Sequence, residues 1–257
     1  MSVFGKPYAS HYDVFYAQKD YPGEVAFVGD IIHRHNPRAT SVLDFGCGSA
    51  RHAVEFVRAG FRVTGIDRST EMVAQAQERR LELPQHLREQ LNLMQGDVTS
   101  FRSAARFDTV VSLFHVVSYQ TTNDTLQSTF GSAGEALIPG GLFVFDFWYG
   151  PSVLTARPQV RVKHVTTPTH TVTRIAEPEH QIDRNVVDVR YTLISVNRTT
   201  GTAEQHREIH SVRYLFLPEI EMIATHSGFK IVEAGEWLTG KRLHEHCWSG
   251  FVAAKLI

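Results

Sequence analysis

Short apolar runs alternate with segments of helical spacing along the first 150 residues of the chain. The apolar runs are short and bounded by turn residues, which is typical of buried strands, whereas apolar residues three or four apart are typical of helices. We predict strands at 41–45, 62–66, 91–95, 109–113 and 142–147, and helices at 24–34, 50–59, 70–81 and 123–137. Such alternation predicts an α/β fold with a mostly parallel sheet and right-handed crossovers.

The pattern changes after Pro151, where strand-like segments alternate apolar with polar residues. This alternation is typical of an antiparallel sheet with one face exposed. We predict strands at 160–167, 171–176, 186–196 and 205–214, then a helix at 218–226 and strands at 229–234 and 249–257. The chain thus divides into a ligand-binding core with an aromatic N-terminal lid (1–150), an antiparallel insertion (151–215) and a return to the core (216–257).

Composition narrows the possible partners. A chain of 257 residues can bury one full core, and its 42% hydrophobic content is that of a globular protein. A net charge of −1 argues against a nucleic-acid partner, which requires a basic face. No apolar stretch approaches the ~20 residues of a membrane span, and two distant cysteines make no disulfide framework. We therefore expect a cytoplasmic protein without a membrane partner.

The most informative motif follows the first predicted strand. Asp44, Gly46 and Gly48 form an Asp-x-Gly-x-Gly turn before a helix, and Asp67 ends the next strand, 21 residues after Gly46. A glycine turn lets backbone approach a ligand, and an acid about 20 residues later can accept hydrogen bonds from a ribose. The sequence therefore predicts a nucleoside-containing ligand.

The flanking residues discriminate among nucleosides. The dinucleotide pattern requires a small residue at position 51, where this chain has Arg51, and no Gly-Lys-Ser/Thr follows the turn as in a P-loop. The S-adenosylmethionine pattern, Asp/Glu-x-Gly-x-Gly-x-Gly, fits except that Ala50 replaces the last glycine. That replacement is mild if φ at Ala50 is negative and a true departure if φ is positive.

With these motifs the chain resembles the class I S-adenosylmethionine-dependent methyltransferases, and most of all the sugar N,N-dimethyltransferases; glycine N-methyltransferase is more distant. Further segments carry the resemblance: Gly65–Met72, Gly96-Asp97-Val98, Phe107–His115 and Pro139-Gly140-Gly141. The resemblance implies a Rossmann-like seven-stranded sheet of order 3-2-1-4-5-7-6 with strand 7 antiparallel. It also implies methyl transfer from S-adenosylmethionine to a small-molecule acceptor, most of all an amine, leaving S-adenosylhomocysteine.

The resemblance assigns candidate cofactor residues. Asp67 is expected to accept from the ribose, Asp97 and Val98 to meet the adenine, and Met72 to pack on it. For Met72 a core role is the competing interpretation, and Cys47 is expected to be a small buried residue rather than a nucleophile. The full expected set is Tyr16, Asp44, Gly46, Cys47, Gly48, Asp67, Arg68, Met72, Asp97, Val98 and Leu113.

His115, after the fourth strand, is the candidate catalytic residue, because an imidazole there can accept a proton or orient an amine. A structural histidine is the alternative. Tyr12, in the aromatic lid, and Trp148 and Tyr149, after the fifth strand, are the candidate acceptor-binding residues. Displacement at a sulfonium needs no metal, so none is expected. The insertion is expected to carry acceptor specificity or a homodimer contact.

Four other functions remain open. A nucleic-acid base methyltransferase would carry Asn/Asp-Pro-Pro-Tyr/Phe where this chain has Ser112-Leu113-Phe114-His115. An O- or carboxyl-methyltransferase would share the same cofactor site. A NAD-dependent oxidoreductase is disfavoured by Arg51 and Asp44. A non-catalytic S-adenosylmethionine-binding module can be distinguished from an enzyme only by an activity measurement.

Overall fold

The computed structural model describes residues 5–257, without the side chains of 6–10, and is organised around one large sheet. Its core has the order β3-β2-β1-β4-β5-β11-β10, in which β11 runs antiparallel to both neighbours. The core strands are β1 Ser41–Phe45, β2 Arg62–Asp67, β3 Leu91–Gln95, β4 Phe107–Ser112, β5 Leu137–Tyr149, β10 Phe229–Glu236 and β11 Ser249–Leu256. The predicted order 3-2-1-4-5-7-6 and the antiparallel last strand are confirmed.

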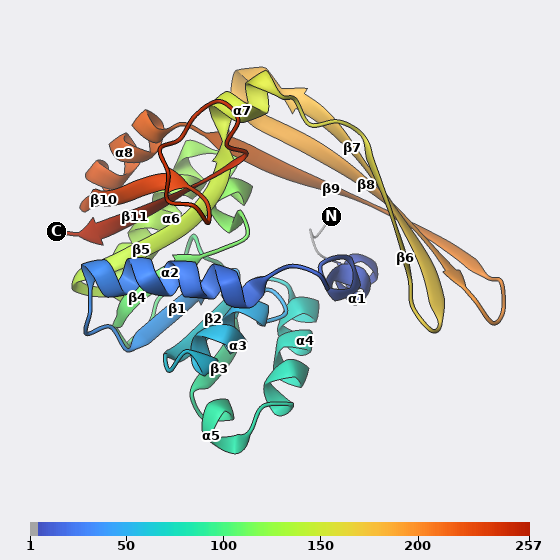
Figure 1. Cartoon of the computed structure of the whole chain (residues 1–257), viewed down its shortest axis with the longest axis horizontal. Helices are drawn as coiled ribbons and strands as arrows, with labels where there is room; N and C mark the ends of the chain where they lie inside the picture. The colour runs from blue at the N-terminus through green and yellow to red at the C-terminus, as the bar shows by residue number, and fades with distance from the viewer. Residues whose placement is uncertain (1–4) are drawn as a thin grey trace.

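Helices cover both faces of this sheet (Figure 1). Alternate residues of each strand enter different cores, so that Val42 packs with α2 and α3 whereas Leu43 packs with α6 and α8. The helices are α1 Lys6–Phe15, α2 Tyr21–His35, α3 Arg51–Arg58, α4 Thr70–Leu81, α5 Gln85–Arg88, α6 Asn123–Ala136, α7 Gly150–Thr155 and α8 Leu217–His226, with 3-10 turns η1 Val116–Tyr119 and η2 Ile182–Arg184. This double layer leaves the carboxyl ends of β1, β2 and β4 as the expected ligand-binding edge.

The predicted antiparallel section after the fifth strand is also confirmed. Its strands, β6 Arg161–Thr166, β7 His170–Gln181, β8 Val186–Asn197 and β9 Ala203–Leu215, form a long curved ribbon beside the core (Figure 1). Among the described ribbon strands, only β9 pairs with the core sheet, through Tyr214 and Leu215 opposite Trp148 and Tyr149 of β5. The boundaries of the three predicted units stay a prediction, and the first unit includes residues 1–4, which lie outside the described part.

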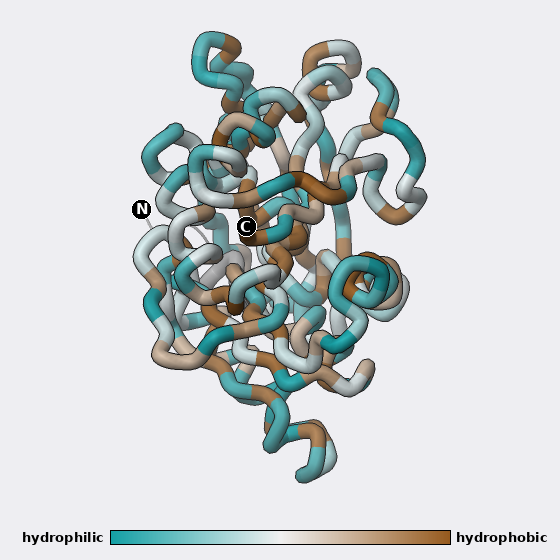
Figure 2. Tube along the Cα trace, turned by 90° about the vertical axis from the view of Figure 1, so that its left-hand side faces the viewer, coloured by the Kyte–Doolittle hydropathy of each residue, from teal (hydrophilic) through white to brown (hydrophobic). Residues whose placement is uncertain are grey.

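Helix α1 lies between the core and the ribbon (Figure 1). Phe15 is buried with Val172 and Leu193 of the ribbon, and the Lys163 ammonium donates to the Phe15 carbonyl. Apolar residues concentrate in the interior, and the protruding loops are mostly hydrophilic (Figure 2). Among the described helices, none is long and apolar enough to cross a membrane.

Helices α2 and α3 are joined by a buried hydrogen bond between Glu24 and His52, and burial lowers the pKa of this histidine. The Glu24 carboxylate lies 2.6 Å from Nε2 of His52 and also pairs with Lys19. Burial alone would raise the pKa of Glu24, but its hydrogen bond to His52 and the charge of Lys19 hold it at about 2. A carboxyl with a depressed folded pKa stabilises the fold above its unfolded pKa and loses that contribution as pH falls through the folded pKa.

We therefore expect Glu24→Gln to cost about 3 kcal/mol of unfolding free energy at neutral pH. The difference from wild type should shrink between pH 4.5 and about 2, where wild-type Glu24 takes up its proton. Urea unfolding across this pH range measures it. A constant difference at every pH would contradict the assignment.

Candidate active site

The glycine turn after β1 has the backbone conformation that the motif requires. The N–H groups of Gly46 and Cys47 both donate to the Ile66 carbonyl, which ties the turn to β2. Gly46 has φ +75°, and a Cβ there would lie 2.5 Å from the Val116 side chain. Gly46 therefore serves two purposes: it permits the left-handed turn and it lets η1 approach it closely.

Ala50 is a true departure from the glycine pattern, because it has φ +62° and is completely buried at the start of α3. A left-handed conformation costs an L-residue with a Cβ about 1–2 kcal/mol. The segment after the turn is thus strained at the position where the pattern has glycine.

We expect Ala50→Gly to stabilise the protein by about 0.5–1 kcal/mol, because relief of this strain exceeds the entropy that glycine loses on folding. Thermal unfolding should show a Tm about 2 °C higher. Ala59→Gly is the matched control, since Ala59 follows the same helix at φ −75° and gains no such relief. Equal losses of Tm in both variants would show that position 50 is not strained.

Two carboxyl groups lie at this turn. Asp67 accepts from the N–H of Gly48 through Oδ2 and from the N–H of Ser69 through Oδ1, both at 2.9 Å. Asp44 is buried, and its Oδ2 has no hydrogen-bond partner. Burial, and next the charge of Asp67, raise the pKa of Asp44 to about 7.

This arrangement fits S-adenosylmethionine. A buried carboxyl oxygen without a partner carries a desolvation cost that a cationic ligand relieves, and this cofactor has a sulfonium and an ammonium. Each Asp67 oxygen keeps a lone pair beyond its backbone bond, as acceptance from a ribose requires.

The other expected cofactor residues are placed differently from one another. Met72 is only 2% exposed, and its Cε lies 3.2 Å from where a Cβ on Gly48 would be. Its side chain therefore packs against the glycine turn. Val98 and Leu113 are buried. Arg68 and Asp97 are exposed, and the Asp97 carboxylate accepts from the N–H and hydroxyl of Thr99. Burial raises the pKa of the Cys47 thiol well above its ordinary value, which makes it a poor nucleophile.

His115 is held by an acid that sequence reasoning gave no role. Its backbone N–H donates to Oδ1 of Asp146 at 3.0 Å, and its imidazole Nδ1 lies 2.7 Å from Oδ2, a close contact that is not aligned as a hydrogen bond. Asp146 is 1% exposed on β5. With Nδ1 facing this carboxylate, Nε2 is the nitrogen presented to a ligand.

An aromatic group surrounds His115. Its ring lies 6.3 Å from that of Trp148 and 5.7 Å from that of Phe114. From α1 and its end, the Tyr16 ring meets Phe114 edge-on at 4.9 Å and the Tyr12 ring at 4.8 Å. The structure therefore brings Tyr12, Tyr16, His115 and Trp148 to one end of the sheet.

Tyr149 is not part of this group. Adjacent strand residues point to opposite faces, and Tyr149 packs with the Phe147 side of β5, at a ring distance of 6.4 Å. A role for Tyr149 in acceptor binding stays a prediction.

Contacts that the sequence did not reveal fasten α1 to the glycine turn. The Asp13 carboxylate accepts from the Ser49 hydroxyl at 2.7 Å and pairs with Arg79 of α4 at 2.5 Å. Arg51, unusual at the start of a helix, places its guanidinium 4.7 Å from the centre of the Tyr21 ring and contacts the Asp13 carbonyl. The N-terminal segment thus lies where the predicted lid would be.

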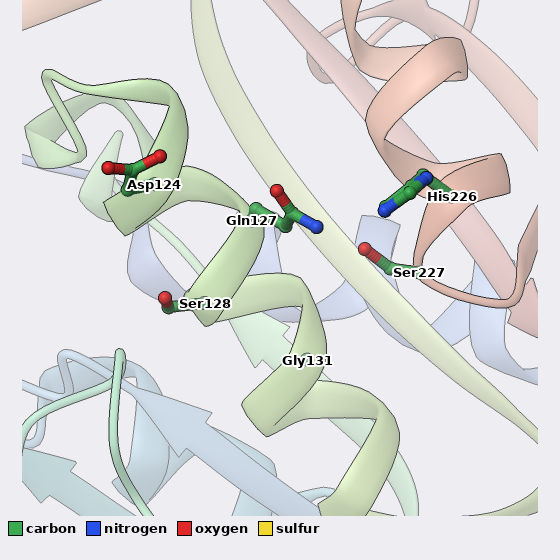
Figure 3. A pocket seen from close by; sticks show the side chains of 6 residues that line it. All are labelled: Asp124, Gln127, Ser128, Gly131, His226 and Ser227. Atoms are coloured by element: carbon green, nitrogen blue, oxygen red, sulfur yellow. The ribbon is translucent and has the colours of Figure 1, made fainter.

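Two further features lie outside this group. A hollow between α6 and α8 is lined by Asp124, Gln127 and His226 among others, and none of the expected cofactor residues reaches it (Figure 3). Within the described residues, one trio has ligand atoms close enough to hold a metal ion, all within 4.8 Å of one another: Glu236, His244 and Cys247. Its Glu236 already accepts from the Thr239 hydroxyl.

Comparison with known proteins agrees with this geometry. Residues 42–141 match a methyltransferase domain family. The chain is 29% identical to the dTDP-3-amino-3,4,6-trideoxy-alpha-D-glucopyranose N,N-dimethyltransferase of Streptomyces venezuelae, covering 91% of this chain and 92% of the relative. It is 24% identical to the dTDP-3-amino-3,6-dideoxy-alpha-D-glucopyranose N,N-dimethyltransferase of Streptomyces fradiae, covering 92% and 87%.

Solved structures share the fold. Streptomyces venezuelae DesVI superposes with a TM-score of 0.79 at 24% identity, covering 97% of this chain and 98% of its own. The sugar N-methyltransferase KedS8 from Streptoalloteichus superposes with a TM-score of 0.80 at 20% identity, covering 100% and 96%. The matched domain and the relatives identify the chain as a methyltransferase, and the solved structures show that it shares their fold. The chain is an enzyme of this class that uses S-adenosylmethionine as its methyl donor.

Proposed function

We propose that this enzyme methylates the amino group of an amino sugar by direct displacement, with the amino sugar carried on a nucleotide. The observation that carries the proposal is His115, which Asp146 orients beside Trp148 at the end of β4. The relatives that align along nine-tenths of the chain have names describing N,N-dimethylation of dTDP-linked amino sugars.

The bound cofactor supplies an electrophilic methyl group on a sulfonium. In the proposal Asp67 holds the ribose, Asp44 faces the cationic end, and the glycine turn sets the depth of the cofactor. His115 accepts a hydrogen bond from the acceptor amine through Nε2 and orients its lone pair toward the methyl group, and Tyr12, Tyr16 and Trp148 exclude water. Alignment of this kind can supply about 7–11 kcal/mol in favourable cases.

Three parts of the proposal concern partners and location. A net charge of −1 supports a small-molecule rather than a nucleic-acid partner. Exposed apolar residues of the ribbon, Val162 and Ile209, and Val160 just before it support a homodimer formed through it. A cytoplasmic location rests on Cys47 and Cys247, both free thiols.

The test is turnover with S-adenosylmethionine on matched acceptors that carry an amine, a hydroxyl or a carboxyl at the same sugar carbon. Mass spectrometry should show addition of one and then two methyl groups to the amine of a dTDP-3-amino sugar. Methylation of the hydroxyl analogue alone would favour an O-methyltransferase. Tight cofactor binding without turnover on any acceptor would favour a non-catalytic binding protein.

A further inference from the structure

A partly buried series of three hydrogen-bonded side chains connects η1, which follows β4, with the ribbon. The Tyr119 hydroxyl lies 3.0 Å from Nδ1 of His210, and Nε2 of His210 lies 3.1 Å from Oε2 of Glu208. His210 is 1% exposed and the Glu208 side chain 9%. None of these three residues was among the candidates from the sequence, because Tyr119 and His210 are 91 positions apart.

The protonation of the three groups determines which atom donates and which accepts in each of the two hydrogen bonds. Burial lowers the pKa of His210 despite the opposing effect of Glu208, so the imidazole is neutral. Burial, and next Tyr191, raise the pKa of Tyr119 well above its ordinary value, so its hydroxyl keeps its proton. A Glu208 carboxylate only accepts, so His210 carries its proton on Nε2 and accepts from Tyr119 through Nδ1.

The position of Tyr119 places these three side chains next to the candidate catalytic residue His115. Tyr119 ends η1, the short helix that begins directly after His115, and the Ser118 hydroxyl of η1 accepts from the backbone N–H of Trp148. At the other end, the second oxygen of Glu208 accepts from the backbone N–H of Gly5, at the start of α1. The groups that face His210 from neighbouring strands are Tyr191, whose ring is 4.8 Å away, and Arg174.

We propose that Tyr119, His210 and Glu208 form a proton relay that removes the proton of the methylated acceptor. The inference rests on the proposed function. As the acceptor nitrogen forms its bond to the methyl carbon and the sulfur–carbon bond breaks, the nitrogen becomes a cation. Its proton passes to the Tyr119 oxygen, the Tyr119 proton passes to Nδ1 of His210, and the Nε2 proton passes to Glu208. Tyr119 and His210 each gain one proton and lose one, His210 changes its tautomer, and Glu208 ends protonated.

The relay explains how one site can transfer two methyl groups. An amine that has received one methyl group is an ammonium without a lone pair, and it must lose a proton before it can attack again. His115 orients the acceptor, and the relay regenerates its lone pair between the two transfers. In this scheme Tyr119 touches the acceptor, whereas His210 and Glu208 are positioning residues that act through it.

The experiment compares Tyr119→Phe, His210→Gln and Glu208→Gln with wild type on the acceptor that wild type methylates. Each variant should lower kcat about 10–100-fold at neutral pH, keep the cofactor Kd and acceptor KM within about threefold, and accumulate monomethyl product. The defect should shrink as pH rises, because hydroxide then removes the proton. A merely structural role would not restore dimethyl product at high pH.

The chain offers a matched control. Glu204 and His206 repeat the same Glu-x-His spacing on β9, with side chains 72% and 38% exposed. His206→Gln and Glu204→Gln should leave the product ratio and the pH profile unchanged. Wild-type product ratios in Tyr119→Phe at every pH would overturn the relay.

A second measurement does not depend on turnover. Nitrogen NMR of the ligand-free protein should show His210 neutral near pH 7 with its proton on Nε2. A proton on Nδ1, or a charged ring, would overturn the relay even if the enzyme methylates amines. If wild type methylates no amine but His210 carries its proton on Nε2, the proposed acceptor is wrong. The relay is then tested with the hydroxyl analogue, because its proton must also leave during methyl transfer.

Discussion

Replacement of Asp67 by alanine is expected to raise the Kd for S-adenosylmethionine about 100-fold, which corresponds to about 2.7 kcal/mol. Hydrogen bonds to a charged group contribute about 1.5–3 kcal/mol each, and the carboxylate has two roles. It accepts from the backbone of Gly48 and Ser69, which fixes the glycine turn, and in the proposal it also accepts from the ribose. Calorimetric titration with the cofactor measures the loss.

Two further variants separate these roles. Asp67→Asn keeps one oxygen acceptor and should lose less affinity than Asp67→Ala. Asp97→Ala removes an exposed carboxylate whose bonds go to its own turn at Thr99, and we expect at most a fivefold change. Asp67→Ala that is folded by circular dichroism and binds the cofactor with wild-type Kd would rule out Asp67 as a cofactor ligand.

The order of the core sheet could be predicted because its signals are local. Most core strands contain a short apolar run next to turn residues, and the resemblance supplied the order. All four ribbon strands were recognised, but β7, β8 and β9 were made too short, and β7 most of all. The prediction ended β7 at residue 176, ahead of Pro178, whereas the strand continues to Gln181. Pro178 is tolerated because β6 pairs only as far as Ala176, so that Pro178 lies on an edge.

The sequence predicted Asp44 and Asp67 as site acids because both belong to a motif with fixed spacing. It did not predict Asp146, because a single acid within the apolar strand β5 has no motif around it. It also did not predict the Asp13–Arg79 pair or the Tyr119–His210 contact, whose members are 66 and 91 positions apart. Side-chain partners brought together by the fold, rather than by local spacing, need the structure.

His115→Ala is expected to lower kcat for methyl transfer about 100-fold and to leave the cofactor Kd within about threefold. In the proposal the imidazole lies beside Asp146 on the acceptor side of the site, and none of its contacts with the described residues reaches the glycine turn. Loss of the ring therefore removes acceptor orientation and preserves cofactor binding. Single-turnover kinetics with bound cofactor measure the chemical step directly.

Asp146→Asn provides the comparison, because it keeps the shape of the side chain and removes the charge beside Nδ1. If the carboxylate fixes the orientation of the ring, this variant should lose about tenfold in kcat, between wild type and His115→Ala. The double variant His115→Ala/Asp146→Asn should be no slower than His115→Ala, since Asp146 acts through the imidazole. Full turnover in His115→Ala would show that His115 is a structural residue, and additive losses in the double variant would show that Asp146 acts independently of it.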